Sequence, residues 1–328
     1  MKIRKLGQDG YSIGEVGLGC WQFGGDFGDM QEETSWKIMA TAVENGVNFF
    51  DTADVYGAGR SEDLIGRFIQ KCSTPITVAT KFGRSDRAYP KNYSQATLRS
   101  CVEDSLKRLS VESIDLLQLH CIPTEVLRQG AVFDWLRQLK QEGLIKEFGA
   151  SVETIEEGLL CIEQDELLSL QVIFNIFRQK LVSELLPQAK SRGVGIIARL
   201  PLASGLLTGK FTKNTTFVAT DHRNYNRDGQ FFNVGETFAG LPFETGVELV
   251  ETIKQDNIIP EGMSMAQMAL RWILDHDAIS VVIPGASSPQ HIQENASISD
   301  ISPLGADLHQ KLAAIYSNSI EEQIRGPY

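Results

Sequence analysis

The sequence predicts an α/β fold, a (β/α)8 TIM barrel formed as a single domain over residues 1–328. Short apolar runs rich in β-branched residues alternate with helical patterns along the chain. The runs are continuous rather than alternating, which is typical of parallel strands buried on both faces. A length of 328 residues suits one such barrel, and no shift in composition marks a domain boundary.

Eight runs are the predicted strands. Six are clear, at 47–51, 76–81, 114–119, 170–174, 194–198 and 280–283, and two are weaker, at 16–19 and 145–150. Helical periodicity follows at 33–44, 94–109, 126–141, 153–163, 182–191 and 264–275. Ser94 is the expected N-cap of the second helix. This alternation predicts strand–helix units repeated around a barrel.

Three segments lie outside the repeat. Residues 2–14, with Gly10 in the middle, predict a β-hairpin that could plug the bottom of the barrel. Residues 304–317 predict an extra C-terminal helix. Residues 211–242 are polar and aromatic without periodicity, and a loop of this length in a compact domain is usually functional or mobile.

A doubly wound open sheet is the rival fold. Such a sheet normally carries G-x-G-x-x-G between its first strand and helix. The stretch Gly17-Leu18-Gly19-Cys20-Trp21-Gln22 has the first two glycines and lacks the third. The barrel is therefore favoured.

Composition narrows the class of protein. The net charge of −11 argues against nucleic-acid binding, which needs a basic face. No apolar run approaches the length of a membrane span, and the basic N-terminus lacks the apolar region of a secretory signal. The five cysteines are scattered without a C-x-x-C pair, which is typical of free thiols in a reducing compartment. These features predict a cytoplasmic protein without a membrane partner.

Four polar residues at or just after predicted strand ends carry the chemistry. Asp51 ends one strand and is followed by Tyr56; Lys81 and His120 end the next two. In a barrel, such side chains meet at the carboxyl-terminal face. A tyrosine is a poor acid at neutral pH unless a cation such as Lys81 favours its phenolate. His120 could orient a carbonyl oxygen, so the set predicts protonation during carbonyl reduction.

Each of these residues also has a structural interpretation. Asp51 alone could cap a turn, Lys81 could be a solvated strand end, His120 a structural histidine and Tyr56 a packing residue. It is the occurrence of all four at the expected positions that favours catalysis.

The motif Asp51-Thr52-Ala53-Asp54-Val55-Tyr56-Gly57, followed by Gly59-Arg60-Ser61-Glu62, closely resembles the signature of the aldo-keto reductases. The likeness continues through 17–21, 115–120, 149–151 and 283–287, and extends to the potassium-channel beta subunits of that superfamily. The resemblance implies reduction of aldehydes or ketones by NADPH. It implies Tyr56 as general acid, Lys81 and Asp51 as its tuning pair, and His120 as the donor that orients substrate.

The resemblance also implies a cofactor site. The loop after the seventh strand offers backbone N–H groups and a lysine to the pyrophosphate, and Ser151 with Gln171 would contact the nicotinamide amide. The expected cofactor contacts are Gly19, Trp21, Ser151, Gln171, Arg199, Leu200, Leu202, Gly205, Leu206, Gly209, Lys210, Gly285, Ser287, His291, Glu294 and Asn295.

Three positions depart from the family pattern. Val152 stands where the family often has Asn, and Arg199 stands where many members stack an aromatic ring on the nicotinamide. A guanidinium can stack on a ring, and its charge would disfavour the oxidised cofactor. Many members place Arg or Lys after Pro-Gly-Ala near the 2′-phosphate, whereas this chain has Ser287, with His291 where Gln is common. Hydroxyls at a helix N-terminus can bind phosphate, and the patch resembles the family version with Ser, Glu and Asn at these positions. NADPH is therefore predicted over NADH, which stays open as the second choice.

The predicted substrate walls are Trp21, Tyr56, Phe82 and His120, with the 211–242 loop, and they suit aldehydes, quinones or small ketones without excluding sugars. Two other functions remain open: a Schiff-base aldolase or lyase using Lys81, and a cofactor-sensing regulatory subunit. No H-x-H or acidic pair at a strand end suggests a metal. The sequence leaves a homo-oligomer open.

Overall fold

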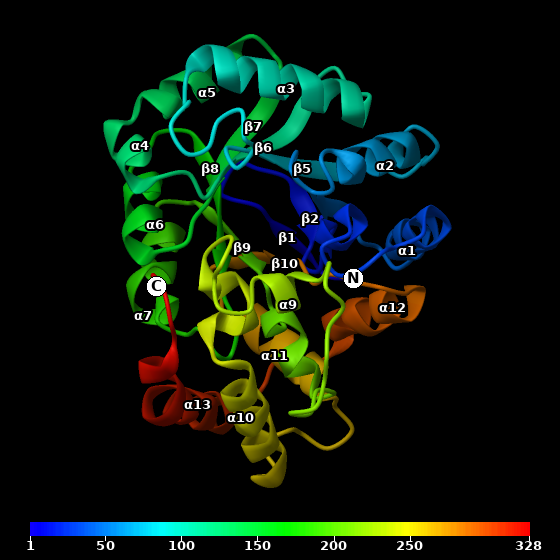
Figure 1. The fold of residues 1–328 in the computed structure, drawn as a ribbon, viewed down its shortest axis with the longest axis vertical. Helices are drawn as coiled ribbons and strands as arrows, with labels where there is room; N and C mark the ends of the chain where they lie inside the picture. Colours follow the sequence, from blue (N-terminus) through cyan, green and yellow to red (C-terminus); the bar gives the residue numbers. More distant parts are fainter.

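The computed structural model describes residues 1–328, and its central feature is a curled sheet of parallel strands surrounded by helices (Figure 1). The eight strands lie in the order β10-β9-β8-β7-β6-β5-β4-β3. They are β3 (Leu18–Gly19), β4 (Phe49–Asp51), β5 (Thr77–Phe82), β6 (Ile114–His120), β7 (Ile145–Ser151), β8 (Leu167–Ile173), β9 (Gly195–Arg199) and β10 (Ile279–Val282).

Single bridges close the sheet into a barrel. Val16 pairs with Val282 and Gly19 with Gly285, both in parallel. Only glycine fits at position 19, because a Cβ atom there would lie 2.8 Å from the Ile283 carbonyl oxygen. All eight predicted strands are present, and the (β/α)8 TIM barrel is confirmed.

The helices of the ring are α1 (Glu32–Glu44), α2 (Arg60–Ile69), α3 (Gln95–Leu109), α4 (Thr124–Gln129), α5 (Ala131–Gln141), α6 (Ile155–Ile162), α7 (Leu181–Glu184), α8 (Leu186–Ser191), α10 (Phe243–Gln255), α11 (Met265–Leu274) and α12 (Pro289–Ala296). The short α9 (His222–Tyr225) belongs to the long loop, and α13 (Ala306–Ile315) follows the ring. None of these helices is both long and apolar enough to cross a bilayer.

Local chemistry explains the helix boundaries. Ser94 caps α3 as predicted, its side chain accepting a hydrogen bond from the Thr97 N–H at 3.2 Å. The helix predicted over 126–141 is instead two helices, α4 and α5, because Gly130 adopts a positive φ of 78° between them. The helix predicted over 182–191 divides at Leu185, next to the proline at the start of α8. Helices α2, α9, α10 and α12 are not among the predicted elements.

The N-terminal hairpin plugs the barrel, as predicted. Strands β1 (Ile3–Lys5) and β2 (Ser12–Gly14) pair antiparallel. Leu6 and Ile13, both fully buried, join the cluster that fills the barrel interior with residues of β4, β5, β6, β8, β9 and β10. A separate, larger core packs the sheet against the helix ring. The bottom of the barrel is thus closed by apolar side chains, which leaves the opposite end for a site.

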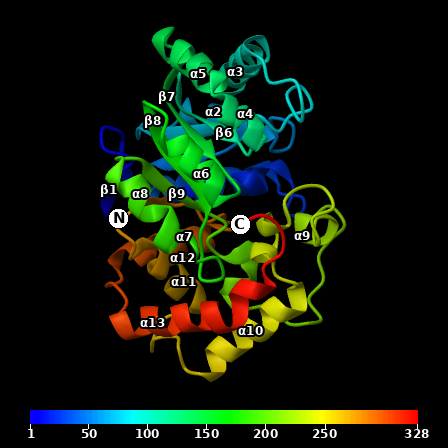
Figure 2. The ribbon, with the colours of Figure 1, turned by 90° about the vertical axis from the view of Figure 1, so that its left-hand side faces the viewer.

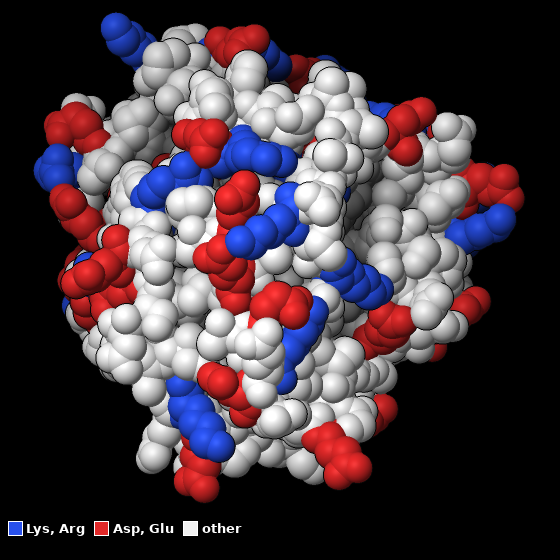
Figure 3. All heavy atoms as spheres, turned by 60° about the horizontal axis from the view of Figure 1, so that its bottom comes forward, with Lys and Arg blue, Asp and Glu red and all other residues white.

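The C-terminal segment packs outside the ring. Helix α13 and α10 lie together at the lower end of the molecule in both views (Figures 1 and 2). The chain then returns to residues 178–180, where the Tyr328 hydroxyl accepts from the Lys180 N–H at 2.8 Å. Acidic and basic side chains are interspersed over the face in Figure 3, without a patch of one sign. That face offers no electrostatic platform for nucleic acid.

Candidate active site

A cavity of about 1000 Å³ lies at the carboxyl-terminal ends of the strands. Its wall includes Asp51, Tyr56, His120 and Gln171, which lie in or follow three different strands, β4, β6 and β8. The parallel register explains why such residues meet: His120 pairs with Ser151, and Ser151 with Gln171, so consecutive strands end at one level. A site here is the arrangement expected of a barrel enzyme.

Three of the predicted residues form one hydrogen-bonded chain. The Lys81 Nζ atom donates to Asp51 Oδ1 at 2.6 Å and to the Tyr56 hydroxyl at 3.3 Å. It also donates to the Thr52 carbonyl oxygen at 2.7 Å. Lys81 is 1% exposed and Asp51 3%, so the ion pair is screened from water. The Tyr56 hydroxyl is the end of this chain that faces the cavity.

Burial raises the pKa of Tyr56, and the neighbouring Lys81 ammonium only partly opposes that effect. The effect of burial on the Tyr56 pKa exceeds that of Lys81, the partner from which the sequence predicts a favoured phenolate. Burial also opposes the charge of Lys81, but Asp51 and Tyr56 outweigh it and raise the pKa of the amine. The resting pair is therefore a protonated phenol beside an ammonium.

His120 completes the set. Its ring lies 6.0 Å from that of Tyr56, centroid to centroid, in an edge-to-face arrangement. Burial, followed by the charges of Arg84, Lys81 and Arg199, lowers the pKa of His120 well below its usual range. A neutral ring carries one N–H that can donate to a ligand oxygen, and the buried Nδ1 atom has no protein partner.

An amide network holds the far oxygen of Asp51. Gln171 Nε2 donates to Asp51 Oδ2 at 2.6 Å, and Gln118 Nε2 donates to the same oxygen at 3.0 Å. Ser151, predicted at the cofactor, does not line the cavity; its hydroxyl donates to Gln171 Oε1 at 3.4 Å. Gln171 therefore belongs to both the cavity wall and the surroundings of the Asp51 carboxylate.

The other expected cofactor contacts divide clearly. All but three of them line the cavity, the exceptions being Ser151, Leu206 and Gly209. Leu206 is buried against Gly246 of α10. Gly209 forms the positive-φ end of the 3-10 segment Ala203–Thr208. Lys210 is exposed on the cavity wall and makes no ion pair, so its charge is free for a ligand.

The cavity wall also fits a nucleotide on structural grounds. Gln22 Oε1 is buried without a hydrogen-bond partner, next to Gly285, where a Cβ atom would lie 1.6 Å from Gln22 Nε2. At the start of α12, His291 Nδ1 lies 3.2 Å from the Ser287 hydroxyl. The wall thus combines open backbone, an unpaired lysine and polar side chains of the kinds that bind a dinucleotide.

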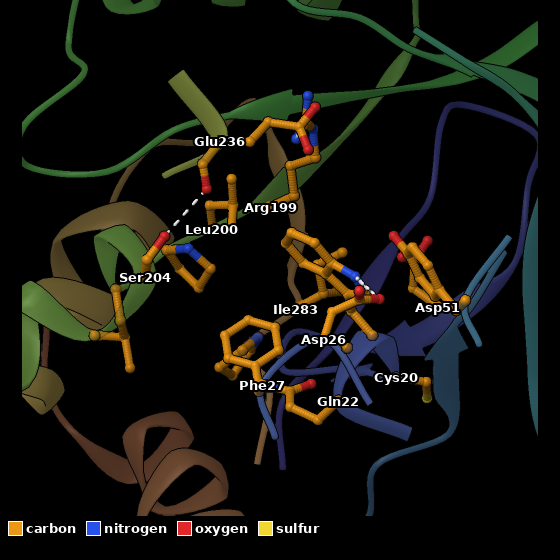
Figure 4. A pocket seen from close by; sticks show the side chains of 18 of the residues that line it. Cys20, Gln22, Asp26, Phe27, Asp51, Arg199, Leu200, Ser204, Glu236 and Ile283 are labelled. Atoms are coloured by element: carbon orange, nitrogen blue, oxygen red, sulfur yellow. Dashed lines mark hydrogen bonds and ion pairs between the residues drawn. The ribbon is translucent and has the colours of Figure 1, made fainter. Parts of the chain in front are cut away.

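A charged cluster that the sequence analysis did not predict borders the same cavity. Arg84 Nη2 lies 2.6 Å from Glu153 Oε1 and 2.5 Å from Glu236 Oε1. Arg199 Nη1 approaches Glu236 Oε1 at 3.4 Å, and Figure 4 shows Arg199 and Glu236 side by side. Burial opposes the charge of Glu236, but Arg84 and Arg199 bring its pKa to about 2.

Glu236 lies in the long loop 211–242, so the ion pairs attach that loop to the barrel. Ser204 strengthens the attachment by donating to the Glu236 carbonyl oxygen at 3.1 Å. At the other side of the mouth, Asp26 accepts from Trp21 Nε1 at 2.9 Å and from the Tyr225 hydroxyl at 2.8 Å. The predicted functional loop is therefore a wall of the cavity, held by charges on both sides.

Phe82 does not reach the cavity. It is 1% exposed and packs edge to face against Tyr93. The other expected substrate contacts, Trp21, Tyr56 and His120, all line the wall. Strand alternation accounts for the difference, because adjacent side chains at the end of β5 point to opposite faces and Lys81 takes the interior.

Asp54 carries a prediction about stability. Its Oδ1 atom is buried without a partner, and burial followed by Glu62 raises its pKa to about 7. An unfolded aspartate titrates near ~3.9. The folded state therefore holds the proton longer, and stability falls as the pH rises from about 4 through about 7. We expect the stability gain of Asp54→Asn over wild type to grow by about 2 to 4 kcal/mol between pH ~4.5 and ~8.5.

Urea unfolding at the two pH values measures this gain. The exposed Asp277, 86% accessible and paired with Lys190, supplies the control. Its Asn variant should show no such growth, and an unchanged gap for Asp54→Asn would contradict the assignment.

A parallel barrel with a cavity at its carboxyl-terminal face is the arrangement found in barrel enzymes. Similarity to known proteins identifies the family. The Aldo/keto reductase family model matches residues 15–317, so the chain belongs to this family of oxidoreductases. The chain is 29% identical over 324 residues to probable aldo-keto reductase 1 of Glycine max, covering 95% of this chain and 88% of the relative.

Two further similarities bear on the predicted resemblance. A probable voltage-gated potassium channel subunit beta of Arabidopsis thaliana is 28% identical over 347 residues, with 99% of this chain and 97% of the relative covered. A solved aldo-keto reductase of Bacillus halodurans in its holo form superposes with a TM-score of 0.77 at 25% identity, covering 96% of each chain. The predicted family is confirmed, including its likeness to the channel subunits.

Proposed function

We propose that this chain reduces an aldehyde or ketone to the alcohol with NADPH, using Tyr56 as the acid. The observation that carries the proposal is the buried chain Asp51–Lys81–Tyr56, whose phenol end opens on the cavity beside His120. A bound reduced nicotinamide supplies the hydride. The residues of the chain supply the proton and the positions of the reacting groups.

In this proposal, His120 donates a hydrogen bond to the carbonyl oxygen and the Tyr56 hydroxyl donates its proton to that oxygen. The ammonium of Lys81, 3.3 Å from the hydroxyl, stabilises the phenolate that remains. Asp51 holds the lysine in place at 2.6 Å. Because the hydroxyl is protonated at rest, the resting site is prepared for reduction rather than for alcohol oxidation.

The cofactor would lie along the wall from Gln171 to α12. Lys210 and the backbone near Gly205 would receive the pyrophosphate, and Ser287 with His291 the 2′-phosphate. Arg199 would face the nicotinamide through its unpartnered Nε side. Glu236 offsets part of the arginine charge at 3.4 Å, which weakens the argument that Arg199 by itself disfavours the oxidised form.

The lyase alternative needs a nucleophilic, unprotonated lysine. Lys81 is 1% exposed, does not line the cavity and donates to three oxygens, and its pKa is raised. The geometry therefore favours an electrostatic role. The regulatory-subunit alternative is supported by the similarity to the Arabidopsis channel subunit, but the intact contact between Tyr56 and Lys81 favours turnover.

The test is a titration with NADPH and with NADH, followed by the loss of nicotinamide absorbance with 4-nitrobenzaldehyde, methylglyoxal and glyceraldehyde. Binding with turnover supports the proposal. Binding without turnover of any carbonyl compound would favour the regulatory subunit, and absence of binding would overturn both. Trapping of a carbonyl compound on Lys81 by borohydride would revive the lyase.

The Lys210→Gln variant tests the placement of the phosphates. Lys210 lies on the cavity wall without an ion pair, so removing its charge should raise the Kd for NADPH about fivefold to tenfold, as expected for one charge-assisted contact. Fluorescence quenching measures the Kd. Lys213 is a matched control, because it pairs with Glu248 outside the cavity lining. Equal Kd values for Lys210→Gln and wild type would remove the lysine from the phosphate site.

A further inference from the structure

Gln118 occupies an unusual place near the proposed catalytic chain. It is 0% exposed, lies in β6 directly opposite Lys81 of β5, and does not line the cavity. Its Nε2 atom donates to Asp51 Oδ2 at 3.0 Å, while Lys81 binds the other oxygen, Oδ1, at 2.6 Å. Gln118 therefore lies outside the reach of a ligand in the cavity, yet it hydrogen-bonds to the Asp51 carboxylate that holds Lys81.

We propose that Gln118 is a positioning residue for the reduction: it fixes the Asp51 carboxylate and offsets its charge, and so sets the strength of Tyr56 as an acid. The inference rests on the proposed function. Without the amide, one hydrogen bond to Oδ2 remains, that of Gln171 at 2.6 Å. Asp51 can then turn about its own side chain, and Lys81 keeps only the Thr52 carbonyl oxygen, at 2.7 Å, as a fixed acceptor. Its direction toward the phenol is then less closely defined.

The negative charge of Asp51 determines the direction in which loss of Gln118 changes the acidity of Tyr56. Asp51 acts to raise the pKa of Tyr56, in addition to the larger effect of burial. An N–H donor on Oδ2 screens that charge from the phenol. Loss of the donor exposes more of it, so the phenol becomes a weaker acid and stays protonated to higher pH. The main route is through Asp51, because no Gln118 atom faces the cavity. Gln118 also accepts from Gln171 Nε2 through its Oε1 atom, at the longer distance of 3.4 Å.

The first experiment compares Gln118→Leu with wild type across the pH range of the carbonyl reduction. We expect kcat to fall about tenfold, the loss of one hydrogen bond to a charged group. The descent of kcat at alkaline pH should move to higher pH, while the Kd for NADPH changes less than twofold. In ultraviolet titrations corrected with Tyr56→Phe, the half-point of the Tyr56 phenolate should move the same way, and this readout does not depend on turnover.

Gln118→Glu gives a signature that a packing role would not give. A glutamate carboxylate cannot donate to Asp51 and repels it, so kcat should fall below that of the leucine variant at alkaline pH. A protonated glutamic acid can donate through its O–H group as the amide did. The activity should therefore recover toward wild type as the pH falls. Should Gln118→Leu fail to fold, Gln118→Met, unbranched and without a donor, replaces it.

The control is Gln179→Leu. Gln179 is a buried glutamine whose Nε2 donates to the Ile176 and Leu312 carbonyl oxygens, at 2.8 and 3.1 Å, away from the cavity. Its loss should lower stability and leave the pH profile unchanged. The inference is overturned if Gln118→Leu keeps the wild-type profile, or if Gln118→Glu does not recover at low pH. If the Gln118 variants give either of these results while wild type is active and Tyr56→Phe is not, the inference fails and the proposed function stands. If wild type shows no turnover, the proposed function itself fails.

Discussion

The Tyr56→Phe variant is expected to lose about 10³-fold in kcat for carbonyl reduction, with little change in the Kd for NADPH. General-acid catalysis by a positioned group contributes on the order of 10²- to 10⁴-fold. The phenylalanine keeps the ring and its packing against Trp21, whose centroid is 5.9 Å away, and removes only the hydroxyl that Lys81 contacts. The measurement is steady-state kinetics together with a cofactor titration of the same preparation.

Tyr11→Phe is the control for loss of a tyrosine hydroxyl. The Tyr11 hydroxyl donates to the Asp115 carbonyl oxygen at 2.9 Å, away from the cavity lining. Its removal should leave kcat within about twofold, since it lies outside the reacting geometry. A Tyr56→Phe enzyme with the wild-type rate would show that the proton comes from another group or from water.

The Lys81→Met variant is expected to lose both activity and stability. Removing the ammonium leaves Asp51, 3% exposed, without its ion partner, and breaking a buried pair from one side costs on the order of 3 to 5 kcal/mol. The loss of unfolding free energy should be about 3 kcal/mol, because Gln118 and Gln171 still donate to Asp51. Urea unfolding at neutral pH measures the loss.

The double variant Asp51→Asn/Lys81→Met separates the two effects. It removes both charges, so most of the lost stability should return. The activity should not return, because no ammonium remains to stabilise the phenolate. A double variant as unstable as Lys81→Met would mean that packing of the lysine stem, rather than the stranded charge, causes the loss.

The charged cluster around Glu236 adds a feature that any substrate must meet. Arg84, Glu153 and Glu236 all line the cavity, and two carboxylates share the single Arg84 Nη2 atom. Burial and the neighbouring Glu236 raise the pKa of Glu153. The pair of carboxylates around Arg84 therefore favours one negative charge over two. The wall consequently carries buried charges beside the aromatic residues that the sequence predicts.

Much of the fold could be predicted because it rests on local patterns. Continuous apolar runs located the eight strands, because a strand buried on both faces is apolar along its whole length. Helical periodicity located most of the helices. The failures were also local. A single helix was predicted across Gly130, although the glycine adopts a φ of 78°, and α2 was missed although it begins after Gly59, whose φ is 94°.

The candidate site divides in the same way. Asp51, Tyr56, Lys81 and His120 were predictable because parallel strands bring their carboxyl ends together, so a strand-end position is already a position at the site. Phe82 adjoins Lys81 in the chain yet faces the outer layer, which only the pleat of β5 determines. Glu236 lies in a loop without periodicity, and the residues next to it in the sequence do not indicate its ion pairs with Arg84 and Arg199.

The sequence by itself determined the fold class, the family and the identity of the residues proposed to act, because these depend on residue types at fixed spacings along single strands. Only the tertiary structure decided how the groups balance one another. Gln118, Gln171 and Lys81 come from three strands to share the two oxygens of Asp51. The pKa of Tyr56 reflects burial more than its lysine partner. Burial and charge depend on distances in three dimensions, and the spacing of residues along the chain does not give those distances.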